Sequence, residues 1–113
     1  MHIKKSDSRA IEHSPKCSVR EFDLGSENMS VATASINGRY PEEGHACNME
    51  CEQIYYVLSG KASLPTSKGD FEIQQGDTYF FEKNEDYWFE AKDFEVVITN
   101  TPAWNKEQCE NRE

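Results

Sequence analysis

The sequence predicts an all-β domain, either a sandwich or a barrel of short strands. Segments rich in β-branched or aromatic residues recur along the chain, and a cluster of Gly, Asn, Asp, Pro or Ser that favours a turn follows each. No long stretch repeats its apolar residues every ~3.6 positions, as an amphipathic helix would. Strands that recur about every 7–12 residues with tight turns are typical of all-β folds.

The expected strands follow one another between residues 17 and 100. In chain order they are 17–24, 29–36, 52–59, 61–66, 70–74, 78–82, 87–91 and 94–100. Side chains in 29–36 alternate between two faces, as in a strand of a sheet. The segment EQIYYVLS, residues 52–59, is almost continuously apolar, so both of its faces are expected to be covered.

One domain is expected, since 113 residues can bury a single core. Residues 1–15 are polar and unpatterned, and they predict a flexible arm with room for a short edge strand. Residues 16–104 hold the strands of the barrel. Residues 105–113 are expected to form a polar C-terminal tail.

The charge of the chain narrows the possible partners. It carries 21 acidic and 12 basic residues, a formal charge of −9, so neither nucleic acid nor an anionic membrane is expected as a partner. No apolar run approaches the ~18–20 residues that span a bilayer. The first residues lack the apolar stretch of a secretory signal, which predicts a cytoplasmic protein. Its cysteines are then expected to be reduced thiols: Cys17, Cys47, Cys51 and Cys109.

Two stretches resemble the conserved motifs of the cupin superfamily, small β-barrels of the double-stranded β-helix (jelly-roll) type. The first is GRYPEEGHACNMECEQIYYVLSG, residues 38–60, and the second is GDFEIQQGDTYFFEKNEDY, residues 69–87. The resemblance covers most of residues 17–104. It implies a jelly-roll cupin barrel.

The resemblance also implies a metal site of three histidines and one glutamate, but this chain has other residues there. Counting back from Gly60 places two of the histidine positions at Ala46 or Cys47 and at Asn48 or Met49, and the glutamate position at Gln53. The third histidine position, in the second motif, falls on Tyr87. Neutral amides and a phenol are poor ligands for transition metals at neutral pH. No cofactor is therefore expected. The alternative is a divalent transition metal held by a displaced set, His45, Cys47, Cys51 and Gln53.

The resemblance places one cavity at the end of the barrel where the two motifs meet. Strand alternation from Gln53 directs Tyr55 towards the interior as well. The candidate ligand-binding residues are Arg39, Tyr40, Asn48, Gln53, Tyr55 and Tyr87. A pocket of amides, phenols and aromatic rings suits a neutral or weakly anionic polar ligand such as a sugar.

The leading hypothesis is a small cytoplasmic cupin that binds a small polar metabolite, with carbohydrate as the candidate class, without a conventional metal. One alternative is a metal-dependent enzyme of the isomerase or dioxygenase type. Another is a metal-free, epimerase-like enzyme in which His45 and Tyr87 exchange protons with the substrate across the mouth of the barrel. A third hypothesis is a protein that acts by self-association, since cupins commonly form homodimers through their sheets.

Overall fold

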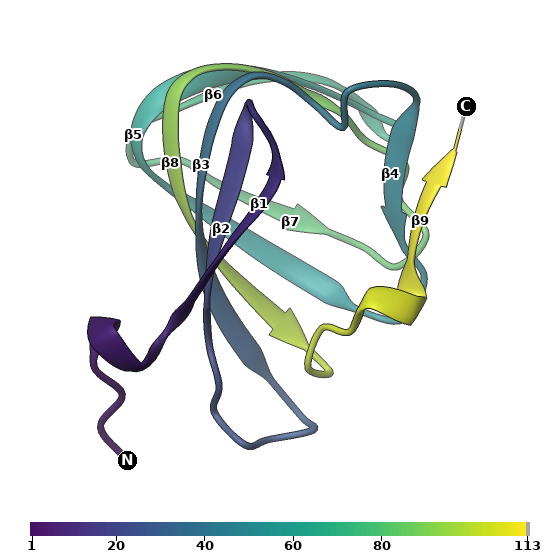
Figure 1. Cartoon of the computed structure of the whole chain (residues 1–113). Helices are drawn as coiled ribbons and strands as arrows, with labels where there is room; N and C mark the ends of the chain where they lie inside the picture. Colours follow the sequence, from purple (N-terminus) through teal and green to yellow (C-terminus); the bar gives the residue numbers. More distant parts are fainter. Residues whose placement is uncertain (113) are drawn as a thin grey trace.

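The strand-forming segments pair in antiparallel fashion along the whole chain (Figure 1). The computed structural model describes residues 1–112. Its first half contains η1 (Lys5–Asp7), β1 (Arg9–Ser14), β2 (Cys17–Phe22), β3 (Ser30–Tyr40) and β4 (His45–Asn48). Its second half contains β5 (Glu52–Thr66), β6 (Gly69–Gln74), β7 (Thr78–Phe81), β8 (Phe89–Thr101), η2 (Lys106–Gln108) and β9 (Cys109–Arg112).

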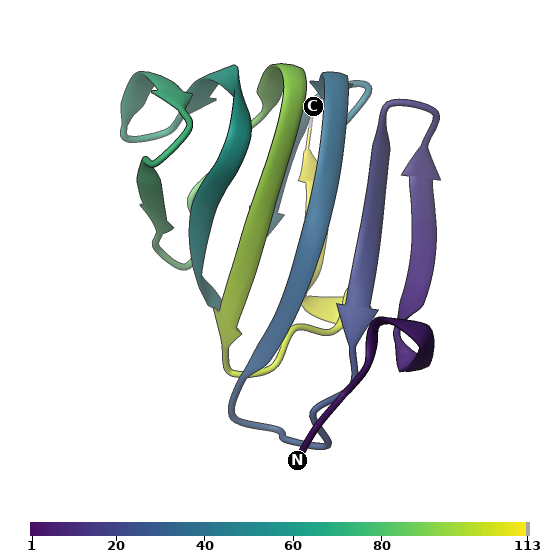
Figure 2. The same ribbon diagram turned by 90° about the vertical axis from the view of Figure 1, so that its left-hand side faces the viewer.

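One large sheet forms most of the barrel wall. Its strand order is β1-β2-β3-β8-β5-β6, and β7 also pairs with β5 (Figure 2). The small sheet β4-β9 lies across the barrel from β3 and β8. At the centre of the sheet β8 pairs with β3 and β5, which precede it by several strands, as in a jelly roll. The predicted all-β jelly-roll barrel is confirmed.

Two expected turns are instead irregularities inside long strands. Segments 52–59 and 61–66 form the single strand β5, and most of 87–100 forms β8. The pairing register of β5 with β8 shifts around Ser59, and Gly60 has a φ of 79°. A Cβ atom at residue 60 would collide with the Asp93 carbonyl oxygen. Gly60 therefore allows two strands to approach at a bulge, and the chain does not reverse there.

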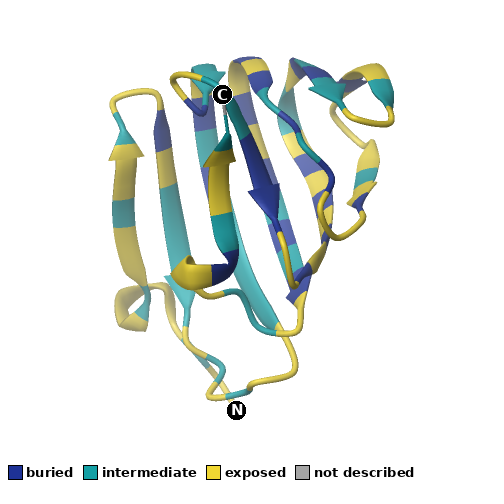
Figure 3. Ribbon diagram, turned by 90° about the vertical axis from the view of Figure 1, so that its right-hand side faces the viewer, coloured by how far each residue is buried: buried dark blue, intermediate teal, exposed yellow. Residues whose placement is uncertain are grey.

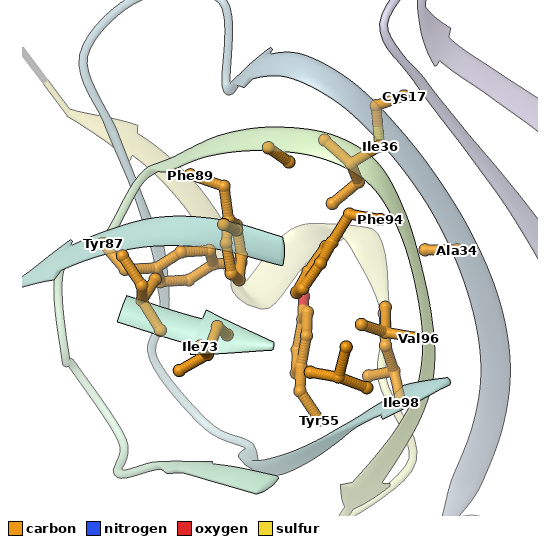
Figure 4. Close-up of a cluster of buried hydrophobic side chains, with 14 of the residues drawn as sticks. Cys17, Ala34, Ile36, Tyr55, Ile73, Tyr87, Phe89, Phe94, Val96 and Ile98 are labelled. Atoms are coloured by element: carbon orange, nitrogen blue, oxygen red, sulfur yellow. The ribbon is translucent and has the colours of Figure 1, made fainter. Parts of the chain in front are cut away.

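Aromatic and branched side chains from several strands fill the barrel. Figure 4 shows Tyr55, Phe89, Phe94 and Val96 directed towards one another inside the ring of strands. All four are buried. The Tyr55 ring stacks on Phe89 at a centroid distance of 5.5 Å. These contacts form the core that supports the strands around the cavity described below.

The prediction that both faces of residues 52–59 are covered is wrong. Gln53, Tyr55 and Val57 point inward and are buried, whereas Ile54, Tyr56 and Leu58 are 44–47% exposed. The alternation is that of a strand with one solvent-facing side.

Both ends of the chain contribute strands. Within the expected N-terminal arm, β1 pairs with β2 as the edge strand of the large sheet. The segment expected as a polar tail is polar but ordered, because β9 pairs with β4 from His45↔Arg112 to Asn48↔Cys109 (Figure 3). Glu113 lies outside the described residues. Within residues 1–112, no helix has the length and apolar character that crossing a membrane requires.

Candidate ligand-binding site

A cavity of about 110 Å³ opens inside the barrel, lined by residues of β1, β2, β3, β4, β5, β8 and β9. A water molecule needs only ~10–15 Å³ of such volume, so the cavity has room for several waters or part of an organic molecule. Five of the six predicted ligand-binding residues line it: Tyr40, Asn48, Gln53, Tyr55 and Tyr87.

The local structure explains why these five side chains point inward. Asn48 and Gln53 lie near the facing ends of β4 and β5, and alternation puts Tyr55 on the same face as Gln53. Tyr87 precedes β8 and is held against β4, because its backbone exchanges hydrogen bonds of 3.0 and 2.8 Å with Ala46.

Arg39 does not occupy the mouth position expected for it. It precedes Tyr40 in β3, and since Tyr40 points inward, Arg39 points outward. Its Nη2 donates to the Gly44 carbonyl oxygen at 3.0 Å, and its guanidinium lies 4.4 Å from the centre of the Trp88 ring. These contacts hold the loop before β4 against the outer surface.

His45 likewise lies outside the cavity. Ala46 and Asn48 are the inward residues of β4, so His45 points to the opposite side, into a shallow depression with Pro65, Asp86 and Trp88. The expected arrangement of His45 and Tyr87 facing each other across the mouth is not observed.

A chain of hydrogen bonds runs along one wall of the cavity. Gln108 Nε2 donates to Asn48 Oδ1 at 3.0 Å, and Asn48 Nδ2 donates to Gln53 Oε1 at 2.7 Å. Gln53 Nε2 then donates to Asn100 Oδ1 at 2.7 Å, and Asn100 Nδ2 donates to Ser30 Oγ at 3.0 Å. The four amides are buried. We call these five residues the amide relay.

Two residues of the amide relay, Asn48 and Gln53, stand at positions where the resemblance implies metal ligands, and the chemistry of the relay does not fit a transition metal. Its groups are neutral, and Asn48 and Gln53 are already bonded to each other. Divalent transition metals in proteins take imidazole, thiolate or carboxylate donors. The relay fills this space with amide-to-amide bonds.

The displaced ligand set is not brought together either. Cys51 Sγ donates to the Pro102 carbonyl oxygen at 3.3 Å, whereas Cys47 lies beside Asp86 and Arg112. Burial raises the pKa of both thiols above the ordinary value of 9.0. In the part of the chain that the structure describes, no three His, Cys, Asp or Glu residues group so as to hold a metal ion.

The tyrosines of the cavity are neutral hydrogen-bonding groups. Burial raises the pKa of Tyr40, Tyr55 and Tyr87 above the ordinary value of 10.0, and the proximity of other ionisable groups adds to the shift. The phenols therefore keep their protons across the physiological pH range, and the deep part of the cavity is polar but uncharged.

Two charged or titratable residues at the rim were missed by sequence reasoning. His13 lies at a bulge in β1, and its ring meets Tyr40 edge-on at a centroid distance of 6.4 Å. Glu21 of β2 also lines the cavity and forms an ion pair of 3.1 Å with Arg9. Alternation along β2 could have placed Glu21 on the inner face with Val19. His13 has no such signal, because a bulge redirects its side chain.

Sequence reasoning also missed the polar residues from distant segments. Ser30, Asn100 and Trp104 line the cavity, and Gln108 stands behind Asn48. Asn100 is an amide at the end of the apolar segment FEVVITN, on the inward face of β8. The position of this amide at the end of an apolar strand segment was the one sequence signal that could have identified Asn100.

No protein-family model matches the chain, and no curated protein is significantly similar to it in sequence. Solved structures do match its fold. Pac13 from Streptomyces, described as a nucleoside dehydratase, superposes with a TM-score of 0.87 at 15% identity, covering 98% of this chain and 89% of Pac13. A Pac13 variant has been solved with uridine.

Two further structures are similar over most of their length. KdgF from Halomonas sp. has a TM-score of 0.74 at 13% identity, with 90% of this chain and 94% of KdgF covered. The polyketide cyclase RemF from Streptomyces resistomycificus has a TM-score of 0.74 at 18% identity, with coverages of 98% and 84%.

Fold and cavity together define a small β-barrel protein with an internal cavity. The barrel has the cupin fold, as the sequence motifs indicated.

Proposed function

We propose that this protein binds a small, neutral, polar metabolite in the barrel cavity, and that a compound containing a sugar ring is the best-matched class. The observation that carries the proposal is the lining of the cavity: buried amides on one wall, and the rings of Tyr40, Tyr55 and Tyr87 around it. Aromatic rings stack on the apolar faces of sugars and bases, and amides and phenols hydrogen-bond to hydroxyl and carbonyl groups.

The similarity to Pac13 supports this class of ligand. Pac13 variants have been solved with uridine, which combines a sugar ring with a flat, neutral base. The cavity here contains neutral groups of the kind that would bind either half of such a molecule. We therefore place nucleosides beside simple sugars as candidates.

Binding is proposed to need no metal, because neutral Asn48, Gln53 and Tyr87 stand at positions where the resemblance implies metal ligands, and Asn48 and Gln53 are bonded to each other. A cytoplasmic location and a homodimer remain predictions from the sequence.

Calorimetry and thermal shift with uridine, other nucleosides, neutral monosaccharides and uronates test the proposal, with and without a chelator. We expect at least one neutral compound to bind equally in both conditions. Tyr55→Phe should weaken this binding, whereas Tyr56→Phe, the same change on the outer face of β5, should leave it unaltered. Silence across the panel, or binding lost with the chelator, would contradict the proposal.

A second candidate function is acid–base catalysis on the bound ligand, favoured by the position of His13. An imidazole beside a buried phenol at the rim of a cavity can move a proton to or from a bound molecule. Elimination of water from a nucleoside, the reaction class in the description of Pac13, is one transformation that such groups support. Mass spectrometry after incubation with the nucleoside panel would reveal loss of water, and His13→Gln should abolish it without abolishing binding. An unchanged rate in His13→Gln would exclude this role for His13.

A further inference from the structure

We infer that the amide relay has one fixed direction, and that this direction reserves the hydroxyl proton of Ser30 for a hydrogen-bond acceptor on the bound ligand. The second half of this inference rests on the proposed function. The direction of the relay does not, because protein groups alone set it.

The relay begins at donors that cannot be reversed. The backbone N–H groups of Glu50 and Cys51 donate to Gln108 Oε1 at 3.1 and 3.3 Å. The indole Nε1–H of Trp104 donates to Asn48 Oδ1 at 3.0 Å. A backbone N–H and an indole N–H only donate, so both amides must turn their oxygens towards these groups. The orientation of an amide, which is often ambiguous, is thereby determined by chemistry.

The direction then passes along the relay. Because the Asn48 oxygen already accepts two hydrogen bonds, its Nδ2 must face Gln53. Gln53 accepts with its oxygen, so its Nε2 donates to Asn100, and Asn100 Nδ2 in turn donates to Ser30. Turning any one amide around would place two donors or two acceptors face to face in a buried site, which is costly.

At Ser30 the relay reaches the cavity. Ser30 Oγ accepts from Asn100 Nδ2 and from the backbone N–H of Trp104, each at 3.0 Å. A hydroxyl oxygen has two lone pairs and one proton, so both lone pairs are engaged and only the proton is left to donate. Ser30 lines the cavity, and among residues 1–112 no protein acceptor engages that proton.

The site therefore favours a ligand with a carbonyl, ether or hydroxyl oxygen at this position. A group that only donates, such as an ammonium, would meet the Ser30 proton and lose its hydration without compensation. Ser30 is in this way a specificity-determining residue for the neutral, oxygen-rich class of ligand proposed above.

Neutron diffraction of the perdeuterated protein without ligand tests the direction of the relay. We expect the deuterons of Asn100 Nδ2 to point at Ser30 Oγ, and the Ser30 deuteron to point into the cavity. A Ser30 deuteron directed at Asn100 Oδ1 or at a backbone carbonyl would overturn the inference.

Calorimetric titration with uridine tests the consequence for binding. Ser30→Ala should weaken uridine binding about 3- to 10-fold, the usual range for one neutral hydrogen bond. Ser30→Thr, which keeps the hydroxyl, should restore most of the affinity. Ser35→Ala is the matched control, because Ser35 lies on the same strand and its Oγ bonds to Glu95 instead.

The outcomes distinguish a failure of the role inferred for Ser30 from a failure of the proposed function. Equal uridine affinity in wild type and a folded Ser30→Ala variant would overturn the role of Ser30 while leaving the binding function intact. If the wild-type protein binds neither uridine nor any other compound of the panel, the proposed function fails. The reservation of the Ser30 proton for a ligand then fails with it. Neutron diffraction still decides the direction of the relay.

Discussion

The two faces of β5 carry opposite kinds of side chain near the start of the strand. The inner face presents Gln53 and Tyr55, which are buried polar groups, followed by the fully buried Val57. The outer face presents Ile54, Tyr56 and Leu58, large and largely apolar side chains that are about half exposed. Phe80 of β7 pairs with Ile54 and extends this exposed outer surface.

A strand with one solvent-facing side usually has its polar residues outside and its apolar residues inside. On β5 the inner face keeps polar groups where they serve the cavity, and the amide relay satisfies their hydrogen bonds. The outer face keeps apolar groups that a single chain leaves in contact with water. Exposed apolar patches often mark contact surfaces, and the homodimer expected from the sequence resemblance would cover this one.

The largest expected effect comes from breaking the inner face at Gln53. Gln53→Leu removes the link between Asn48 and Asn100, and it leaves an amide N–H and an amide oxygen without partners. At ~1–3 kcal/mol for each unsatisfied buried group, we expect the free energy of unfolding to fall by about 2–6 kcal/mol in urea denaturation. The control is Ile54→Gln, a polar change of similar size on the outer face, expected to cost less than ~1 kcal/mol. Equal losses of unfolding free energy in the two variants would show that the amide relay does not contribute to stability.

A smaller difference in stability between the two faces is expected further along β5, at Val57 and Leu58. Val57→Ala creates a void in a fully buried position and should lower the free energy of unfolding by about 2 kcal/mol. Leu58→Ala removes more atoms, but from a half-exposed side chain, and we expect a cost below ~1 kcal/mol. Urea midpoints at an unchanged m-value measure both. A larger loss for Leu58→Ala would mean that the outer face is already covered in solution.

Alkaline pH should weaken the fold through the inner phenol. Burial raises the pKa of Tyr55 in the folded protein above the value of 10.0 expected after unfolding. The contribution of protonated Tyr55 to the free energy of unfolding is therefore complete below about pH 10. It is lost as the pH rises from there towards the pKa in the folded protein, and the free energy of unfolding falls by up to ~1.4 kcal/mol per pH unit. Urea denaturation between pH 8 and 11.5 measures the decline, which Tyr55→Phe should make shallower. An identical decline in this variant would assign the effect to other groups.

The smallest effect on folding is expected from charging the outer face. Leu58→Glu should change the free energy of unfolding of the single chain by less than ~0.5 kcal/mol, because a half-exposed side chain can remain hydrated. It should nevertheless convert a homodimer into a monomer in light scattering, since burying a carboxylate at an interface is costly. A wild-type protein that is already monomeric would refute the homodimer prediction.

The sequence by itself determined the local features of this protein. Turn residues between β-forming segments predicted the all-β fold, and a period of two placed Gln53 and Tyr55 on one face of a strand. The resemblance of the motifs identified Asn48 and Tyr87 as inward residues because the spacing to Gly60, and within the second motif, is preserved. These features depend on neighbours within a few residues, so the sequence can specify them.

Only the tertiary structure decided which distant residues meet. Gln53 bonds to Asn100 across 47 positions, Asn48 to Gln108 across 60, and Asn100 to Ser30 across 70. In the tertiary structure Arg39 and His45 also point outward, and a bulge in β1 places His13 at the rim of the cavity. The period of a strand states which residues share a face, but the strand order of the sheet decides what that face meets. The amide relay exists because β8, β3 and the C-terminal segment come together around β4 and β5.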